Sequence, residues 1–328
     1  MFRLMVVILC LRCDRRTGIA IKDMERLPPY DLVDLRLLIA LAEHKHFARA
    51  ADACALSQPA LSARIQRLEA SLGTPLIFRG KRFEGFTPDG ELALGWARRI
   101  LSDCSGLVQE IRAEEQGAHG TLRIGVVPSV TPFAGRLSGI MAEKHPNLMP
   151  QVLSLSSMAI KAGLADFSLH AGITYLDTEG LDPVDELPAN SRYLFTETYC
   201  LVARPECVQG AQTSVSWKAA AKLPMGLLTT DMQNRRIINT AFRRVATEPN
   251  LRFESNSFNA ILAMVRDRGF ATILPRQQVD AGLIEGLHVW DLVEPQIEAR
   301  IGLVIPQREP ILPVTRALLQ CIETMNVS

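Results

Sequence analysis

The sequence predicts three regions of different fold class: an all-α-rich N-terminal domain, one long linker helix, and a C-terminal α/β domain. Three observations support this division. Apolar residues recur at helical spacing up to Leu72, a single apolar stripe runs from Leu92 to Ile111, and from Thr121 onward short apolar strands alternate with helical stretches. A chain of 328 residues is long enough for separate domains that each bury a core.

The composition is that of an ordinary globular protein without an overall excess of charge. Hydrophobic residues make up 48% of the chain and charged residues 22%, and the formal net charge is +1. A nucleic-acid surface must therefore be confined to one part of the molecule. The seven cysteines have no disulfide-framework spacing, which indicates reduced thiols and a cytoplasmic protein.

Residues 1–31 are expected to be an N-terminal extension without a folded role. The apolar run from Leu4 to Leu11 is far shorter than the roughly 20 residues that cross a bilayer. No small-x-small cleavage site follows it. Met24 offers an alternative start shortly before the first amphipathic helix. We therefore expect a disordered tail or a misassigned start, and no membrane partner.

The next three helices form a helix-turn-helix pattern. A first apolar stripe covers residues 35–42, and a short alanine-rich helix covers residues 47–54. Ser57 then offers an N-cap, Pro59 lies in the first turn where a missing N–H costs nothing, and Gly73 follows the third helix. In a helix-turn-helix, the helix after the turn is the one that enters a DNA groove.

A hairpin and a long helix follow. Residues 76–86 alternate loosely around two glycines, which suits a small β-hairpin wing. Thr87 and Pro88 then provide an N-cap and first-turn pair for a helix that reaches about Glu115. Because this helix has one apolar face and no domain around it, we expect it to pack against a second copy of itself. The predicted domains are residues 32–86 (winged helix-turn-helix), 87–116 (linker helix) and 117–328 (α/β domain).

The third helix and the hairpin carry the residue types that DNA binding requires. Short polar side chains in the first turns of a recognition helix reach base edges, and glutamine can bond an adenine edge twice. From Ser57 to Arg82 there are five basic residues and one acidic residue, Glu69, so positive charge is concentrated here. A generic three-helix core with a solvated charged face is the alternative interpretation. The predicted DNA-binding residues are Ser57, Gln58, Pro59, Ser62, Arg64, Arg67, Arg79, Lys81 and Arg82.

Four short motifs occur in order within residues 35–90: Phe-x-Arg-Ala-Ala, Ser-Gln-Pro-Ala-Leu-Ser, Leu-Glu-x-x-Leu-Gly and Thr-Pro-x-Gly. With them, this segment resembles the DNA-binding module of LysR-type transcription regulators. One position departs from the family pattern. Members often carry a polar or basic residue directly after the second serine of the second motif, where this chain has Ala63. A base contact usually made there is therefore not expected.

The resemblance implies how this module would work. Arg79 and Arg82 would lie near the backbone or in the minor groove of double-stranded operator DNA. Thr87–Glu115 would be the dimerisation helix, and dimers would pair into tetramers on two adjacent DNA sites. The residues placed in the major groove would be Gln58, Pro59 and Ser62.

A weaker resemblance to the same family extends over residues 120–322. It implies a periplasmic-binding-protein-like, two-lobed α/β effector domain, with a small molecule held in the cleft between the lobes. Lobe one would comprise residues 121–197 and 296–328, and lobe two residues 198–295. The effector would change the lobe arrangement, and so the spacing of the DNA-binding dimers, only if it binds one arrangement better than the other.

Three helix starts in this domain suggest a site for an anion, because free backbone N–H groups and the helix dipole favour negative charge there. Thr131 is expected to be an N-cap, residues 229–231 precede a second helix, and Ser257 opens a third. If the lobes close, all three could face one cleft holding a small carboxylate or other small anion. Each residue could instead be only a helix cap. The predicted effector-binding residues are Ser129, Val130, Thr131, Thr230, Asn256 and Ser257.

Other functions find less support in the sequence. Cys200 and Cys207 could form an oxidant-sensing thiol pair, but Cys200 falls in an apolar strand where a buried cysteine is usually a small hydrophobe. No nucleophile elbow, Gly-rich phosphate loop or paired carboxylates are evident, so no catalytic residue, metal site or cofactor is predicted. The main alternative is a ligand-binding protein whose helix-turn-helix makes only protein contacts, and the basic hairpin argues against it.

Overall fold

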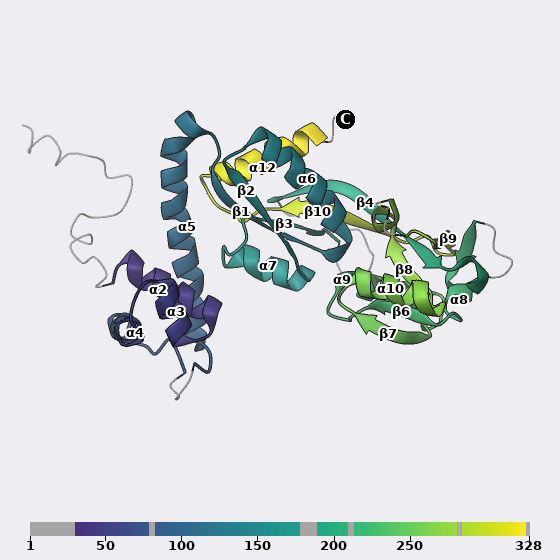
Figure 1. Ribbon diagram of the computed structural model, residues 1–328, viewed down its shortest axis with the longest axis horizontal. Coiled ribbons are helices and arrows are strands. Elements are labelled where there is room, and N and C mark those ends of the chain that lie inside the picture. Colours follow the sequence, from purple (N-terminus) through teal and green to yellow (C-terminus); the bar gives the residue numbers. More distant parts are fainter. Residues whose placement is uncertain are drawn as a thin grey trace, which may run out of the picture. The chain divides into compact units, whose positions relative to one another are not determined.

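The computed structural model describes residues 30–78, 83–177, 189–208, 213–280, 282 and 284–325 (Figure 1). The chain divides into two compact units, residues 1–97 and 98–328, and the division falls inside helix α5. Nearly all of the predicted N-terminal extension lies outside the described residues, as does the tip of the predicted hairpin with Arg79, Lys81 and Arg82.

Three short helices pack around the core of the first unit. Asp31 caps the first of them. Its carboxylate accepts a hydrogen bond of 3.0 Å from the N–H of Asp34, and the Asp34 carboxylate accepts one of 3.1 Å from the N–H of Asp31. Asp31 is therefore part of the folded unit and not of the predicted extension. Ser57 caps the third helix and Gly73, at φ 74°, ends it, as the sequence predicted. The helices are α2 (Leu32–His44), α3 (Phe47–Ala53) and α4 (Gln58–Leu72).

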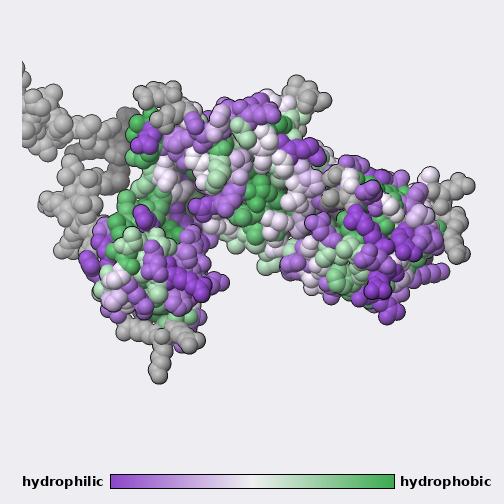
Figure 2. Space-filling view, in the orientation of Figure 1, coloured by the Kyte–Doolittle hydropathy of each residue, from purple (hydrophilic) through white to green (hydrophobic). Residues whose placement is uncertain are grey.

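Helix α5 (Pro88–Gln116) is the long helix that the sequence predicted, with 29 residues and a length of roughly 40 Å. It begins where expected, because the Thr87 hydroxyl accepts a hydrogen bond of 3.0 Å from the N–H of Gly90. Apolar surface lies along this helix in Figure 2. Its exposed large apolar residues are Leu92, Trp96, Leu107, Val108 and Ile111.

The part of α5 from Arg98 onward belongs to the second unit and packs within it. A side chain on Gly106 would meet the end of the Leu312 side chain, so glycine here lets the segment around Leu312 pack closely against the helix. The Arg308 guanidinium also donates to the Ser102 hydroxyl at 3.0 Å. Packing and ion pairs therefore fix residues 98–112 of the helix within the second unit. Within this unit, the ion pairs of the helix are Arg98 with Asp166, Asp103 with Arg308 and Glu110 with Arg316.

The second unit is built on a mixed sheet with the strand order β2-β1-β3-β10-β4-β9-β5, to which β8 adds by pairing with β4. Strand β1 is parallel to both of its neighbours, whereas β10 is antiparallel to β3 and β4. Strands β6 and β7 form a separate parallel pair. The strands are β1 (Gly120–Val126), β2 (Leu148–Ser154), β3 (Ala171–Tyr175), β4 (Ser191–Ala203), β5 (Ser214–Ser216), β6 (Met225–Leu228), β7 (Leu251–Ser255), β8 (Thr272–Pro275), β9 (His288–Val293) and β10 (Glu298–Val304).

Helices cover these sheets. Three of them contact the strands that precede β4 in the chain, and the others pack with the strands that follow it. A 3-10 turn, η3 (Pro128–Val130), follows β1, and a second, η4 (Pro205–Cys207), follows β4. The first group is α6 (Thr131–Lys144), α7 (Ser157–Ala165) and, from the C-terminus, α12 (Pro313–Met325). The second group is α8 (Trp217–Ala220), α9 (Gln233–Arg244), α10 (Phe258–Arg268) and α11 (Arg276–Asp280).

Strand β4 carries the chain from one lobe to the other. Residues 191–198 pair with β10, whereas residues 199–203 pair with β8 and β9. The partner therefore changes between Thr198, opposite Glu298, and Tyr199, opposite Pro275. The chain returns to the first lobe between β9 and β10. The unit has the two-lobed α/β fold that the resemblance implied, with two segments crossing between the lobes (Figure 1).

Within the described ranges, no helix combines the length and the apolar character needed to span a bilayer. In the same part of the chain, His, Cys, Asp and Glu side chains do not gather in any group of three or more that could hold a metal ion.

Candidate functional site

The start of helix α4 presents the polar residues predicted to read DNA. The Ser57 hydroxyl accepts a hydrogen bond of 3.3 Å from the N–H of Ala60, which fixes it at the N-terminal edge of the helix. Ser57, Gln58 and Pro59 are exposed, and Ser62 is half-buried. Gln58 and Ser62 are four residues apart, so they lie on the same side of the helix. Such an edge of amide and hydroxyl groups can hydrogen-bond the base edges of a major groove.

Arg64, predicted to bind DNA, forms ion pairs with two carboxylates. Its Nη1 atom lies 3.1 Å from Oδ1 of Asp31 and 2.9 Å from Oδ1 of Asp34, and Asp34 is buried. Hydrogen bonds from the backbone of Asp34 and from the Arg64 guanidinium hold the pKa of Asp31 below its ordinary value. Because the guanidinium is engaged by two carboxylates, we leave Arg64 out of the proposed phosphate contacts.

Arg67 is exposed but faces a different side of helix α4 from Gln58. Nine residues of α-helix correspond to about two and a half turns, which places the two side chains on opposite sides of the axis. The other predicted basic residues, on the wing, lie outside the described residues. The base of the wing is described, because Ile77 and Phe86 form an antiparallel bridge and the N–H of Phe78 donates to the carbonyl of Gly85 at 3.1 Å.

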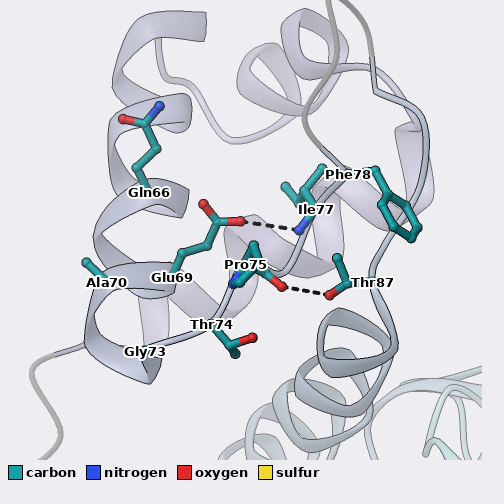
Figure 3. Close-up of a pocket in the computed structure, with 9 residues that line it drawn as sticks. All are labelled: Gln66, Glu69, Ala70, Gly73, Thr74, Pro75, Ile77, Phe78 and Thr87. Carbon is teal, nitrogen blue, oxygen red and sulfur yellow. Dashed lines mark hydrogen bonds between the residues drawn. The ribbon is translucent and has the colours of Figure 1, made fainter.

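Glu69, the one acidic residue of the basic segment, fastens the wing to helix α4. Its Oε1 atom accepts hydrogen bonds from the N–H groups of Leu76 at 2.8 Å and Ile77 at 3.2 Å. On the other strand of the hairpin, the Thr87 hydroxyl donates to the carbonyl of Pro75 at 2.7 Å. Figure 3 shows the bonds of Glu69 with Ile77 and of Thr87 with Pro75, beside a hollow of about 630 Å³ between helix and hairpin. The wing base is therefore fixed relative to the recognition helix.

The six predicted effector-binding residues are not brought together in one exposed site. Ser129 and Val130 are buried, Ser257 is half-buried, and the other three are exposed. The N-cap expected at Thr131 is wrong: it is the first residue of α6, after η3, and its hydroxyl bonds to the Pro128 carbonyl. Ser257 stands at the N-cap position of α10 but makes no side-chain capping bond. The exposed residues are Thr131, Thr230 and Asn256.

A buried polar cluster surrounds the point where β4 passes between the lobes. At its centre, Oε1 of Glu197 accepts hydrogen bonds of 2.8 Å from the hydroxyls of both Tyr175 and Tyr199. The Ser129 hydroxyl lies 3.2 Å from that of Tyr175. We call this group the junction cluster, and its members are Ser129, Tyr175, Glu197, Tyr199, Asn234 and Gln278.

Two glutamines connect the lobes around this cluster. Nε2 of Gln278, on α11, donates to the carbonyl oxygens of Pro128 at 3.1 Å and Ser129 at 2.9 Å. Nε2 of Gln233, in the first turn of α9, donates to the carbonyl of Asp177 at 3.2 Å. Both donors belong to lobe two and all three acceptors to lobe one. The lobes therefore cannot part without breaking these bonds.

Two groups in the junction cluster lack hydrogen-bond partners among the described residues. They are Oε2 of Glu197 and both polar atoms of the Asn234 side chain. Glu197 is 0% and Asn234 3% exposed. Burial raises the pKa of Glu197. Its polar neighbours oppose that rise, the Ser129 hydroxyl most strongly and the Asn234 side chain least. An unpaired buried polar group costs about 1–3 kcal/mol, so stability of the fold does not explain these side chains.

Of the junction cluster, only Ser129 was predicted from the sequence. The available signal was an acidic residue, Glu197, within the otherwise uncharged stretch of residues 193–203. The other members of the cluster are residues 129, 175, 199, 234 and 278, and apart from residue 199 no sequence spacing connects them to Glu197.

The two cysteines considered as a redox pair are both engaged as hydrogen-bond donors. The Cys200 thiol is buried and donates to the carbonyl of Leu274 at 3.3 Å. Burial raises the pKa of Cys200 to about 12. The Cys207 thiol is half-buried and donates to the carbonyl of Gly269 at 3.2 Å. The raised pKa keeps the Cys200 thiol protonated at neutral pH, and a protonated thiol is a poor nucleophile.

The chain combines a helix-turn-helix with a polar leading edge, a long helix with an exposed apolar face and a two-lobed α/β domain. This combination defines a DNA-binding regulator with an effector-binding domain. Residues 32–91 match the bacterial regulatory helix-turn-helix proteins of the lysR family, and residues 115–326 match the LysR substrate binding domain. The chain therefore belongs to the LysR family of transcription regulators, which are not enzymes.

Its relatives include regulators named for hydrogen peroxide. The chain is 34% identical over 198 residues to a probable hydrogen peroxide-inducible genes activator of Streptomyces viridosporus, covering 60% of this chain and 62% of that protein. It is 26% identical over 293 residues to a hydrogen peroxide-inducible genes activator of Haemophilus influenzae, covering 85% and 91%. A solved structure, a full-length OxyR variant from Pseudomonas aeruginosa, matches with a TM-score of 0.69 at 22% identity and covers 89% and 97%. At that identity the structural likeness shows the fold alone.

Proposed function

We propose that this chain binds double-stranded operator DNA with the leading edge of helix α4 and regulates transcription at the nucleoid in the cytoplasm. The observation that carries the proposal is the exposed Ser57-Gln58-Pro59 edge, inside the segment that matches the family's helix-turn-helix. Ser62 would join it at the base edges. The phosphate contacts would come from Arg67, Arg79, Lys81 and Arg82.

The protein would act as a dimer through Thr87–Glu115, and dimers would pair into tetramers. Support comes from the apolar face of α5, where Leu92 and Leu107 are each 64% and Ile111 70% exposed. Contiguous apolar surface on a soluble protein usually marks an interface. Along the chain, residues 32–86 would bind DNA, 87–116 would dimerise, and 117–328 would bind the effector.

The effector would be a small molecule held between the two lobes. The segments around Ser129, Val130, Thr131, Thr230, Asn256 and Ser257 would contribute to its site, with an anionic group of the effector at a helix start. The bonds from Gln233 and Gln278 join the lobes and would respond to any change in their arrangement. Since α5 is held on lobe one, a change in the lobes would reach the dimer helix.

The DNA proposal is tested by fluorescence anisotropy of the full chain on the promoter region beside its own gene. Gln58→Ala should weaken specific binding by about 1–3 kcal/mol, a loss of roughly 5- to 150-fold, because a two-bond contact to a base edge is removed. The matched control is Gln320→Ala, at an exposed position on α12, and it should bind like the wild type. Unchanged affinity of the Gln58 variant would contradict the proposed DNA contact and favour a helix-turn-helix that contacts only proteins.

Peroxide sensing is suggested by the names of the relatives, but not by Cys200 and Cys207. The pKa of Cys200, raised to about 12 by burial, leaves almost no thiolate at neutral pH. We therefore do not extend a thiol switch to this chain.

A further inference from the structure

We infer that the junction cluster receives an N–H donor group of the effector, with Glu197 and Asn234 as the residues that determine specificity. The inference rests on the proposed control by a small molecule held between the lobes, and it adds the chemical class of that molecule. The expected effector carries an ammonium or comparable N–H group, in addition to any anionic group bound at a helix start.

The unbonded oxygen atoms of Glu197 and Asn234 favour a ligand that carries a hydrogen-bond donor. Oε2 of Glu197 can only accept while the carboxyl is ionised, and Oδ1 of Asn234 accepts in every state. Neither atom makes a hydrogen bond among the described residues, although the Asn234 side chain lies close enough to Glu197 to lower the pKa of its carboxyl. No basic side chain is among the groups that influence the pKa of Glu197. An ammonium would supply both the hydrogen bonds and the counter-charge that the cluster lacks, whereas a carboxylate alone would meet Glu197 without a balancing cation.

The acceptor is held in a fixed direction. Both tyrosine hydroxyls bond the same oxygen, Oε1 of Glu197, and thereby orient the carboxyl group with Oε2 turned away from them. The Ser129 hydroxyl steadies Tyr175 in turn. A binding group held by its neighbours loses little conformational freedom when a ligand arrives, which favours affinity. The two tyrosines are therefore positioning residues for Glu197.

The cluster also lies where a ligand would affect both lobes. Glu197 precedes by two residues the point at which β4 passes from one sheet to the other. Asn234 comes from the first turn of α9 in lobe two, and Ser129 comes from lobe one. A donor group bound between Glu197 and Asn234 would thus join lobe two to the crossing strand, and access to it requires release of the glutamine bonds between the lobes.

The test uses the full chain and three matched three-carbon probes: propylamine, propionate and β-alanine, each at millimolar concentration. The measurement is the shift in melting temperature. Propylamine should raise it, β-alanine should raise it more because it adds a carboxylate, and propionate should have the smallest effect. Glu197→Gln should lose the propylamine response, while Glu298→Gln, an exposed glutamate on the neighbouring strand, should keep it.

The outcomes separate this inference from the proposed function. A response to propionate alone, no response to any probe, or an undiminished propylamine response in Glu197→Gln would each overturn the inference. Glu197→Gln retains an acceptor for both tyrosines and should still bind operator DNA. If it does not fold, Asn234→Ala serves as the second variant, and its full propylamine response would also overturn the inference. Failure of the DNA proposal is read independently, from the Gln58→Ala binding measurement.

Discussion

The leading edge of helix α4 and the junction cluster are both polar, but one is exposed and the other is buried. Gln58 stands in water, so its amide is satisfied whether or not DNA is bound. Glu197 is fully buried and only one of its oxygens is paired among the described residues. An exposed polar group therefore tells little about its role until its family is known, whereas a buried unpaired one requires an explanation by itself.

The same difference predicts which condition each region responds to. Exposed basic side chains act on DNA through counterion release, so their effect depends on salt. Buried titratable groups have shifted pKa values, so their effect on stability depends on pH. Two buried groups of the second unit illustrate this. The pKa of His170 is lowered and that of Glu197 is raised, so acidification destabilises the fold through His170 and stabilises it through Glu197.

The largest expected effect is acid destabilisation through His170. Burial, followed by the nearby charges of Arg123 and Arg308, lowers the pKa of His170 to about 4 from an ordinary value of 6.5. Its Nδ1 accepts the N–H of Arg123 at 2.9 Å, which needs the neutral ring. On acidification, the unfolded chain therefore protonates His170 at a higher pH than the folded chain does. The stabilisation is complete above pH 6.5 and is lost as the pH falls to about 4. The total loss is about 3 kcal/mol.

Denaturant unfolding of the full chain at several pH values between 4 and 7 measures this loss. In His170→Asn the corresponding part of the pH dependence should disappear, because asparagine does not titrate. If wild type and variant lose stability equally on acidification, the burial of His170 does not control the acid limit.

A smaller effect of opposite sign is expected from Glu197. Burial raises its pKa above the ordinary 4.5, so the folded chain holds the proton more tightly than the unfolded chain. Its contribution to stability is therefore present below that value and is lost as pH rises through the raised pKa. Relative to Glu197→Gln, the wild type should become progressively less stable from pH 4.5 upward, as measured by the free energy of unfolding. A difference that does not change with pH would contradict the burial of an ionisable carboxyl.

The smallest effect separates two arginines on one helix. Arg67→Ala should reduce the slope of log affinity against log salt by about 1, because one phosphate contact is lost, without a change in melting temperature. Arg64→Ala should instead lower the melting temperature, because buried Asp34 loses its cation. Operator titrations at several salt concentrations, with thermal unfolding of each variant, measure both. Identical behaviour of the two variants would show that Arg64 is not committed to its carboxylates.

The helices of the first unit could be predicted closely because their signals are local. Ser57, Gly73 and Thr87 mark helix ends through bonds to residues at most four positions away, and the structure has those ends where the sequence put them. Thr131 was misjudged because η3 adds a turn before α6, and a capping residue is not distinguished from the first helical residue by its type.

By itself, the sequence determined the order of helices and strands, the family, and the polar edge that is proposed to read DNA, because periodicity, caps and motifs all act over a few neighbouring residues. Only the tertiary structure decided that Arg64 pairs with Asp31 and Asp34, about 30 positions away along the chain, and that Glu197 is enclosed by side chains from both lobes. Burial and ion pairing depend on which surfaces come into contact when sheets and helices pack. A local sequence pattern does not predict these contacts.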